Sequence, residues 1–159
     1  MKSIRFVYQR LDEPQRSAVI ALWTQAGVLP MAEAVRRVDE ISALILDGQA
    51  LIGVSTAYLH PLAGTDTPYF HLRSFILPQH RGCNATRKQL MQTNFTGLRE
   101  HASQAQGLVI ELENPKLARL GANTNYLHRR GYRYHGQSPR GLPLWYVRFD
   151  QAEGIFRDL

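Results

Sequence analysis

The sequence predicts a single α/β (α+β) domain of 159 residues, in which helices are interspersed among strands. One observation is a hairpin signature, an Asp-Gly pair between two apolar runs. A second is a long apolar strand that leads through a basic turn into an amphipathic helix. The third is the order of segments: strand, two helices, three antiparallel strands, helix, strand, helix and two strands. No repeat, linker or low-complexity segment interrupts this order, so we expect one domain, residues 1–159.

The N-terminal segments read as a strand followed by two helices. Residues 4–8 are rich in apolar and β-branched side chains with an alternating polar position, which predicts a strand. Asp12 or Glu13 ahead of Pro14 favours a helix start, because proline suits the first helical position. A shorter helix is predicted at 31–39.

Three antiparallel strands are predicted next. The Asp-Gly turn joins strands at 41–46 and 50–55, since this dipeptide favours the left-handed angles of a two-residue hairpin turn. Residues 58–68 are rich in Pro, Gly, Thr and Asp, which predicts a loop. The long third strand is predicted at 69–77.

The end of this long strand is the most informative stretch of the chain. Pro78 stops the strand because it has no N–H for the ladder. A basic turn follows at 79–82, and the side chain of Asn84 can then cap a helix. The helical spacing continues through the apolar residues Met91, Phe95, Leu98 and Ala102. A glycine-bearing turn before a helix predicts an anion site, since free backbone N–H groups and the helix dipole both favour a phosphate.

The C-terminal third is predicted to contain a strand, a helix and two closing strands. A short strand of the buried type is expected at 107–112, and a helix at 115–130. Gly131 can end that helix in the left-handed conformation. The closing strands are predicted at 132–134 and 142–149.

The strand end and turn resemble motif A of the GCN5-related N-acetyltransferase (GNAT) superfamily. In that motif an apolar-x-apolar-Pro strand end feeds Arg-Gly-x-Gly-x-Gly, and residues 75–82 match the first half. Asn84 and Thr86 stand where the pattern has glycine. The order of segments also resembles this family over roughly residues 2–149. The resemblance implies a GNAT-like acyl-CoA N-acyltransferase fold, with a central mixed, mostly antiparallel sheet flanked by helices.

The resemblance also implies a cofactor, acetyl-CoA or another acyl-CoA. In the family, backbone amides of the turn hold the pyrophosphate, and the preceding strand pairs with the pantetheine arm. The residues expected to bind the cofactor are Phe75, Ile76, Leu77, Arg81, Gly82, Cys83, Asn84, Ala85, Thr86 and Arg87. The basic side chains around the turn, Lys88 included, could instead form a solvated face of the helix that binds no phosphate.

The implied activity is direct attack of an amine on the thioester. The amine must lose a proton and the carbonyl oxygen must be stabilised, here by a backbone N–H within 75–77. The candidates for acid–base catalysis are the bases Glu111, Glu113 and His71 and the acid Tyr126. Strand alternation puts Glu111 and Glu113 on one face. The family's last helix commonly ends in apolar-Tyr-x-x-x-Gly-Phe, and in this sequence Leu127 occupies the position of that tyrosine. Each of the four candidates could instead be an ordinary surface or core side chain.

The charge of the chain leaves a second class of function open. The net charge is +6 and the sequence pI is about 9.8, which favours anionic partners: coenzyme A, nucleic acid or an acidic substrate. One alternative is therefore a non-catalytic module that binds acyl-CoA or nucleic acid. Another is an acyltransferase that acts on a nucleic-acid base or on an amine that the nucleic acid carries. The arginines proposed to dock nucleic acid are Arg36, Arg37, Arg129, Arg130, Arg133 and Arg140.

The remaining composition sets expectations about location and partners. Cys83 is the single cysteine, so an internal disulfide is excluded and a reducing cytosol is compatible. No apolar stretch approaches ~18 residues, and the N-terminus lacks the apolar region of a secretory signal. We therefore expect a cytoplasmic protein without a membrane span or a bound metal. Its acceptor is expected to be a small-molecule or protein amine, and a homodimer is left open.

Overall fold

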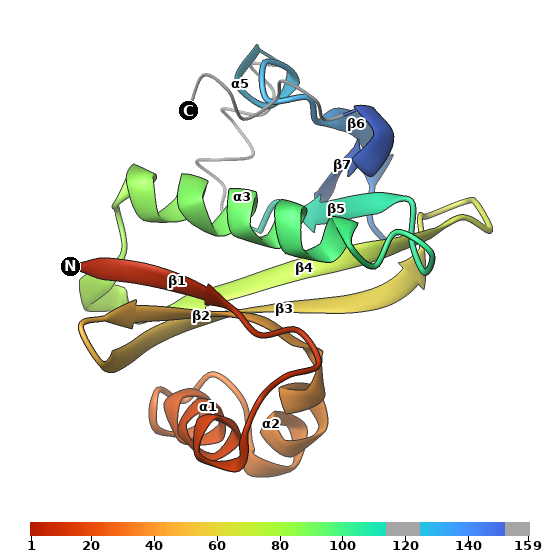
Figure 1. Cartoon of the computed structure of the whole chain (residues 1–159). Coiled ribbons are helices and arrows are strands. Elements are labelled where there is room, and N and C mark those ends of the chain that lie inside the picture. Colours follow the sequence, from red (N-terminus) through yellow and green to blue (C-terminus); the bar gives the residue numbers. More distant parts are fainter. Residues whose placement is uncertain (114–124, 152–159) are drawn as a thin grey trace. The chain divides into compact units, whose positions relative to one another are not determined.

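The computed structural model of the chain describes residues 1–113 and 125–151 (Figure 1). Its contacts divide into two compact units. The N-terminal unit comprises Met1–Ala57 and Arg73–Leu98, and the C-terminal unit comprises Tyr58–Leu72 and Arg99–Leu159. The prediction of one domain stays a prediction.

Seven strands pair in the order β1-β2-β3-β4-β5-β7-β6. The pairs β1–β2, β2–β3, β5–β7 and β6–β7 are antiparallel, whereas β4 and β5 are parallel. This confirms the predicted mixed, mostly antiparallel sheet flanked by helices. The strands are β1 Lys2–Phe6, β2 Ile41–Asp47, β3 Ala50–Pro61, β4 Pro68–Ile76, β5 Gly107–Glu111, β6 Arg133–Gln137 and β7 Pro143–Arg148. The helices are α1 Glu13–Gln25, α2 Met31–Arg37, α3 Asn84–Arg99 and α5 Asn125–His128, with short 3-10 turns at Val38–Glu40, Pro78–His80 and Phe149–Gln151.

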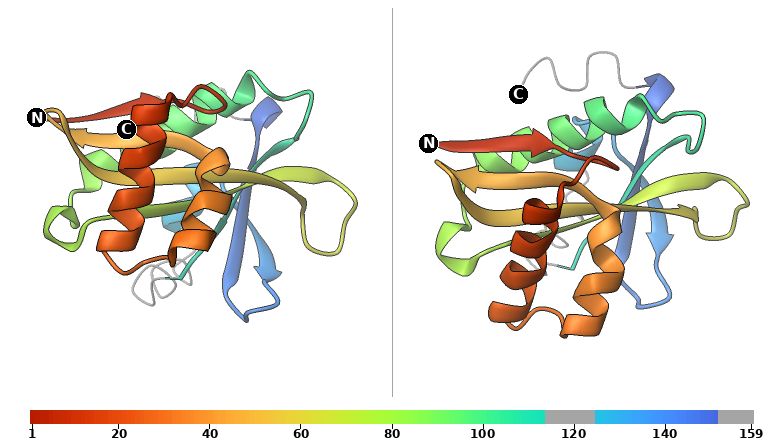
Figure 2. Two further views of the ribbon diagram at one scale, coloured as in Figure 1. Left: turned by 90° about the horizontal axis from the view of Figure 1, so that it is seen from below. Right: turned by 60° about the horizontal axis from the view of Figure 1, so that its bottom comes forward.

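In the N-terminal unit, helices cover both faces of the strands. Asp12 accepts a hydrogen bond from the Gln15 backbone and Gln15 returns one, a capping box that begins α1 as predicted. Trp23 of α1 and Ala34 of α2 pack on one face, and Figure 2 shows these two helices side by side against β2 and β3. Leu90 of α3 packs on the opposite face. Both faces are therefore buried, which stabilises the strands that carry the turn.

The β2–β3 hairpin differs from its prediction in two ways. The register pairs Asp47 with Ala50, so Gly48 and Gln49 form the turn in place of Asp47 and Gly48. β3 continues to Pro61 through residues predicted as loop. Loop composition was misleading there, because pairing with a neighbouring strand outweighs the weak local preferences of these residues.

A β-bulge in β2 changes which side chains face α3. Ile41 pairs with Thr56 and Ala43 pairs with Ser55, which leaves Ser42 as the extra residue. Ile41 packs with the α1–α2 side of the core and Ala43 with the α3 side. A bulge breaks the usual alternation, so Ser42 joins Ala43 on the α3 face.

The C-terminal unit is built on β5, β7 and β6. β5 pairs with β7 from Gly107 opposite Arg148 to Glu111 opposite Leu144. Most of the predicted helix at 115–130 lies outside the described residues, and α5 is its described end. Gly131, at φ 80°, follows α5 and donates to the His128 carbonyl at 2.9 Å, which confirms the predicted left-handed stop. No helix in the described part of the chain is long and apolar enough to cross a membrane.

Candidate cofactor turn and acidic strand

The turn between β4 and α3 exposes free backbone donors. Gly82 has φ 91°, a left-handed conformation that favours glycine, and the space beside its Cα is open. Within the described part of the chain, the N–H groups of Gly82, Cys83 and Asn84 have no hydrogen-bond partner. These donors lie at the positive end of the α3 dipole, so the turn is suited to bind an anion.

Cys83, and not Asn84, caps α3. The Cys83 carbonyl accepts the first helical hydrogen bond from the Arg87 N–H at 3.3 Å, and Asn84 is already helical. Hydrogen bonds from the Thr86 side chain and backbone, together with Ala85 and the charge of Lys2, lower the pKa of the Cys83 thiol. Gly82, and not Asn84, takes the left-handed conformation in this turn. Thr86 is buried beneath the turn.

At the end of β4, one edge of the strand is paired with β3 and the other edge points away from it. The Leu77 N–H donates to the Ile52 carbonyl at 2.9 Å, and a side chain on Gly53 would collide with the Phe75 carbonyl. The backbone groups of Phe75 and Leu77 therefore point toward β3, and those of Ser74 and Ile76 point away from it. The register of β4 with β5 covers only Phe70 to Leu72. Of the three residues expected to supply the oxyanion donor, only Ile76 directs its N–H to the open edge.

Arg81 lies on this open edge. Its Nε donates to the Ile76 carbonyl at 2.8 Å, and its guanidinium stacks over the Phe75 ring at 5.7 Å from the centroid. Arg81 is thus placed on the strand end, while Ala85 and Arg87 are exposed on the first turn of α3. Arg81 therefore occupies the carbonyl to which an extended ligand would pair.

In the C-terminal unit, the two candidate glutamates contact one arginine. Arg140 Nη1 lies 3.2 Å from Glu111 Oε1 and 2.9 Å from Glu113 Oε1. Only the Glu113 contact has hydrogen-bond geometry. The Glu111 side chain is 27% exposed and that of Glu113 is 61% exposed. Glu111 thus keeps a buried carboxylate oxygen without a hydrogen bond among the described residues, a feature that requires an explanation.

The other catalytic candidates are placed less favourably. The His71 ring stacks on Tyr58 at 5.2 Å between centroids, and its Nε2 lies 3.2 Å from the His60 carbonyl. The register pairs His71 with Val109, so His71 and Glu111 share one face of the sheet. Tyr126 belongs to α5, and its side chain lies outside the described part.

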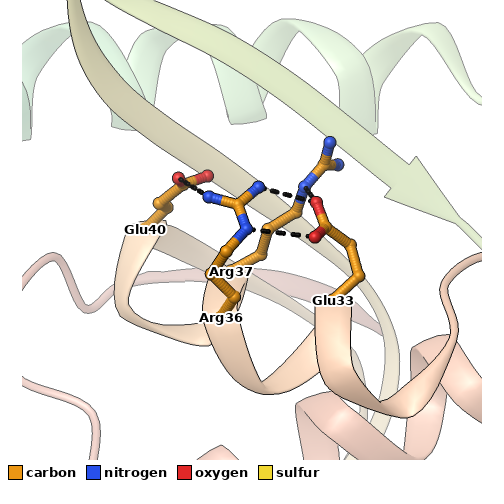
Figure 3. Close-up of polar contacts among 4 residues, drawn as sticks. All are labelled: Glu33, Arg36, Arg37 and Glu40. Atoms are coloured by element: carbon orange, nitrogen blue, oxygen red, sulfur yellow. Dashed lines mark hydrogen bonds and ion pairs between the residues drawn. The ribbon is translucent and has the colours of Figure 1, made fainter.

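Three of the six arginines that were proposed to dock nucleic acid form ion pairs with carboxylates. Arg36 and Arg37 contact Glu33 at 2.6 and 2.7 Å, and Arg36 lies 3.9 Å from Glu40; Figure 3 draws these four residues together. The hydrogen bond from Arg36 is the main cause that lowers the pKa of Glu33 to about 2. Arg140 is the third paired arginine, whereas Arg129 and Arg133 are exposed. The nucleic-acid docking surface stays a prediction, and three of its six arginines are paired with carboxylates.

Sequence reasoning missed the role of Arg140 beside the glutamates. Arg140 comes from the connection between β6 and β7, 27 residues after Glu113, and no local pattern links them. Among the described residues, no group of three or more His, Cys, Asp or Glu could hold a metal ion.

The arrangement of strands and helices is that of the GNAT fold. No protein-family sequence model and no curated protein sequence matches the chain. Solved structures do match it over nearly its whole length, at identities between 9 and 15%. These likenesses confirm the predicted fold.

Three of these structures illustrate the likeness. The GNAT-family acetyltransferase of Streptococcus pneumoniae has a TM-score of 0.62 and 12% identity, covering 93% of this chain and 99% of its own. The N-acetyltransferase of Staphylococcus aureus Mu50 has a TM-score of 0.64 and 9% identity, covering 94% and 99%. The diaminobutyrate acetyltransferase EctA of Paenibacillus lautus, solved with its substrate and coenzyme A, has a TM-score of 0.59 and 11% identity, covering 93% and 95%.

Proposed function

We propose that this chain is an acyl-CoA-dependent N-acyltransferase that transfers an acyl group, in the simplest case acetyl, to an amine. The observation that carries the proposal is the Gly82 turn, with three free N–H groups at the start of a long helix. The residues present fit the cofactor, because glycine leaves room for a phosphate and Asn84 does not need left-handed angles. The GNAT fold of the chain supports the same function.

Bound acyl-CoA would supply an activated thioester. The N–H groups of Gly82, Cys83 and Asn84 would hold its pyrophosphate, and the N–H of Ile76 would stabilise charge on the acyl oxygen. The amine nitrogen would form a bond to the acyl carbon as the C–S bond breaks, and the sulfur would leave as a thiolate that takes up, as the coenzyme A thiol, the proton that the base removed from the amine. Glu111 is the proposed base for the amine proton, since its buried Oε1 lies 3.2 Å from Arg140 but has no hydrogen bond among the described residues, whereas Glu113 is hydrogen-bonded to Arg140.

The acceptor is proposed to be a small-molecule or protein amine. Structures of similar fold include one solved with L-2,4-diaminobutyric acid and one bound to a Gag peptide, which supports both kinds of amine. The ion pairs of Arg36, Arg37 and Arg140 weigh against nucleic acid as the primary partner.

Coenzyme A and acetyl-CoA are expected to raise the melting temperature of the protein. A ligand that binds only the folded state at about 100 times its Kd stabilises it by about 2.7 kcal/mol. For a domain of this size that corresponds to roughly 5–11 °C. Scanning fluorimetry measures the shift, and pantetheine, which lacks the phosphates, should produce a smaller one. A folded sample with no shift at millimolar coenzyme A would contradict the proposal, and thiol release with a panel of amines separates catalysis from mere binding.

A further inference from the structure

A one-way chain of buried hydrogen bonds runs beneath α3. Ser42 Oγ donates to Asn94 Oδ1 at 2.7 Å, and Asn94 Nδ2 donates to Ser55 Oγ at 2.9 Å. Ser55 Oγ in turn donates to the Arg73 carbonyl at 3.2 Å. Asn94 and Ser42 are fully buried and Ser55 is 1% exposed. These four residues form what we call the Asn94 relay, and it ties α3 to three strands, β2, β3 and β4.

The relay depends on two special placements. The β-bulge lets Ser42 and Ala43 both face α3, where regular alternation would have allowed only one of them to do so. Arg73 is the first β4 residue after the three that pair with β5, so the relay ends on the part of β4 that leads to the turn. The direction of donation is also fixed. If the Asn94 amide were reversed, Ser55 would have to donate to it and would release the Arg73 carbonyl.

The apolar contacts that Leu90 of α3 makes with the strands tolerate small shifts. Leu90 packs against Ala43, Ile45 and Ile52, and apolar side chains of similar volume accommodate sliding and rotation better than hydrogen bonds do. Asn94 lies ten residues after Asn84, which is about 15 Å along the helix. A tilt of about 5° at Asn94 would therefore move the turn by roughly 1.3 Å, enough to spoil a site built from fixed backbone donors.

From this geometry we propose that Asn94 is a positioning residue. It holds α3 at one rotation and tilt on the strands, and thereby places the N–H groups of Gly82–Asn84 correctly relative to the Ile76 edge. The inference deepens the proposed function and rests on it, because the turn is taken to bind the cofactor phosphates. Asn94 touches no reacting atom and acts only through the helix that it fixes.

The test replaces the three side chains of the relay together. The triple variant Ser42→Ala, Asn94→Leu, Ser55→Ala removes their polar groups and leaves only the Arg73 carbonyl without its donor, so its urea midpoint should stay close to that of the unmodified protein. Calorimetry should show coenzyme A binding at least about 10-fold weaker. The matched control is Leu98→Ala, one turn further along α3, which lowers the urea midpoint through a cavity but should leave the Kd within about twofold.

A second readout works without any ligand. The backbone amide NMR shifts of Gly82, Cys83 and Asn84 report where the turn lies, and they should change in the triple variant and stay constant in Leu98→Ala. If the triple variant does not fold, Ser55→Ala alone breaks the link to Arg73 and should cause a smaller loss in the same direction. Unchanged amide shifts and an unchanged Kd in a stable variant would overturn the positioning role. Failure of the unmodified protein to bind coenzyme A would instead refute the proposed function, while the amide shifts still decide the inference.

Discussion

Replacement of Gly82 by Glu is expected to abolish coenzyme A binding. Gly82 has φ 91°, so a residue with a side chain strains the backbone at this position. The carboxylate of the glutamate would also repel the pyrophosphate from the N–H groups of the turn. Like charges in a binding site cost several kcal/mol, and about 2.8 kcal/mol already corresponds to 100-fold in affinity. Titration calorimetry should therefore show a loss of at least about 100-fold.

Two controls separate this effect from backbone strain and from thiol chemistry. Gly136 has φ 90° and open space beside its Cα, so Gly136→Glu imposes a similar strain away from the turn. It should lower the melting temperature about as much as Gly82→Glu and leave coenzyme A binding intact. Cys83→Ala should also bind nearly normally, because the turn acts through its backbone. If Cys83→Ala lost activity as severely as Gly82→Glu, a covalent thiol mechanism would have to be considered.

The second large effect is expected at Glu111. Removing a general base typically costs 10²–10⁴ in rate, and Glu111→Gln should lower kcat by about 10²–10³. Glu113→Gln is the matched control, since Glu113 lies next to the same Arg140 but is exposed and hydrogen-bonded to it. We expect its kcat to stay within about threefold. The assay follows thiol release from acetyl-CoA with an amine identified in the panel above.

The outcome of this pair is decisive for the assignment of the base. Equal losses in both variants would mean that the glutamates act together through Arg140. Full activity of Glu111→Gln would refute Glu111 as the base and direct attention to His71. An unchanged affinity for coenzyme A in both variants shows that the substitutions leave the turn intact.

Local signals predicted the elements around the turn well. Pro78 and Gly82 stop the strand and turn the chain, and the apolar spacing of α3 is visible in the sequence. The cap was misplaced by one residue because Asn is a far commoner cap than Cys, and only the structure shows that the first helical hydrogen bond goes to the Cys83 carbonyl.

The environment of the glutamates could not be read from the sequence. Alternation placed Glu111 and Glu113 on one face, and their shared contact with Arg140 agrees with this. Which of the two is the less exposed depends on where the β6–β7 connection brings Arg140, and that is a tertiary property. The Asn94 relay was invisible for the same reason, since it depends on a bulge that shifts the facing of Ser42.

The open edge of β4 also bears on solubility. Unpaired strand edges are templates for pairing between molecules, and proteins commonly protect them with charged side chains. With Arg81 hydrogen-bonded to the Ile76 carbonyl, the strand end presents a cation where another chain would otherwise add a strand. Under the proposed function, the side chain that would move aside for the cofactor would therefore also hinder strand addition between molecules. Light scattering of Arg81→Ala, which should rise without coenzyme A and fall when it is added, measures this protection.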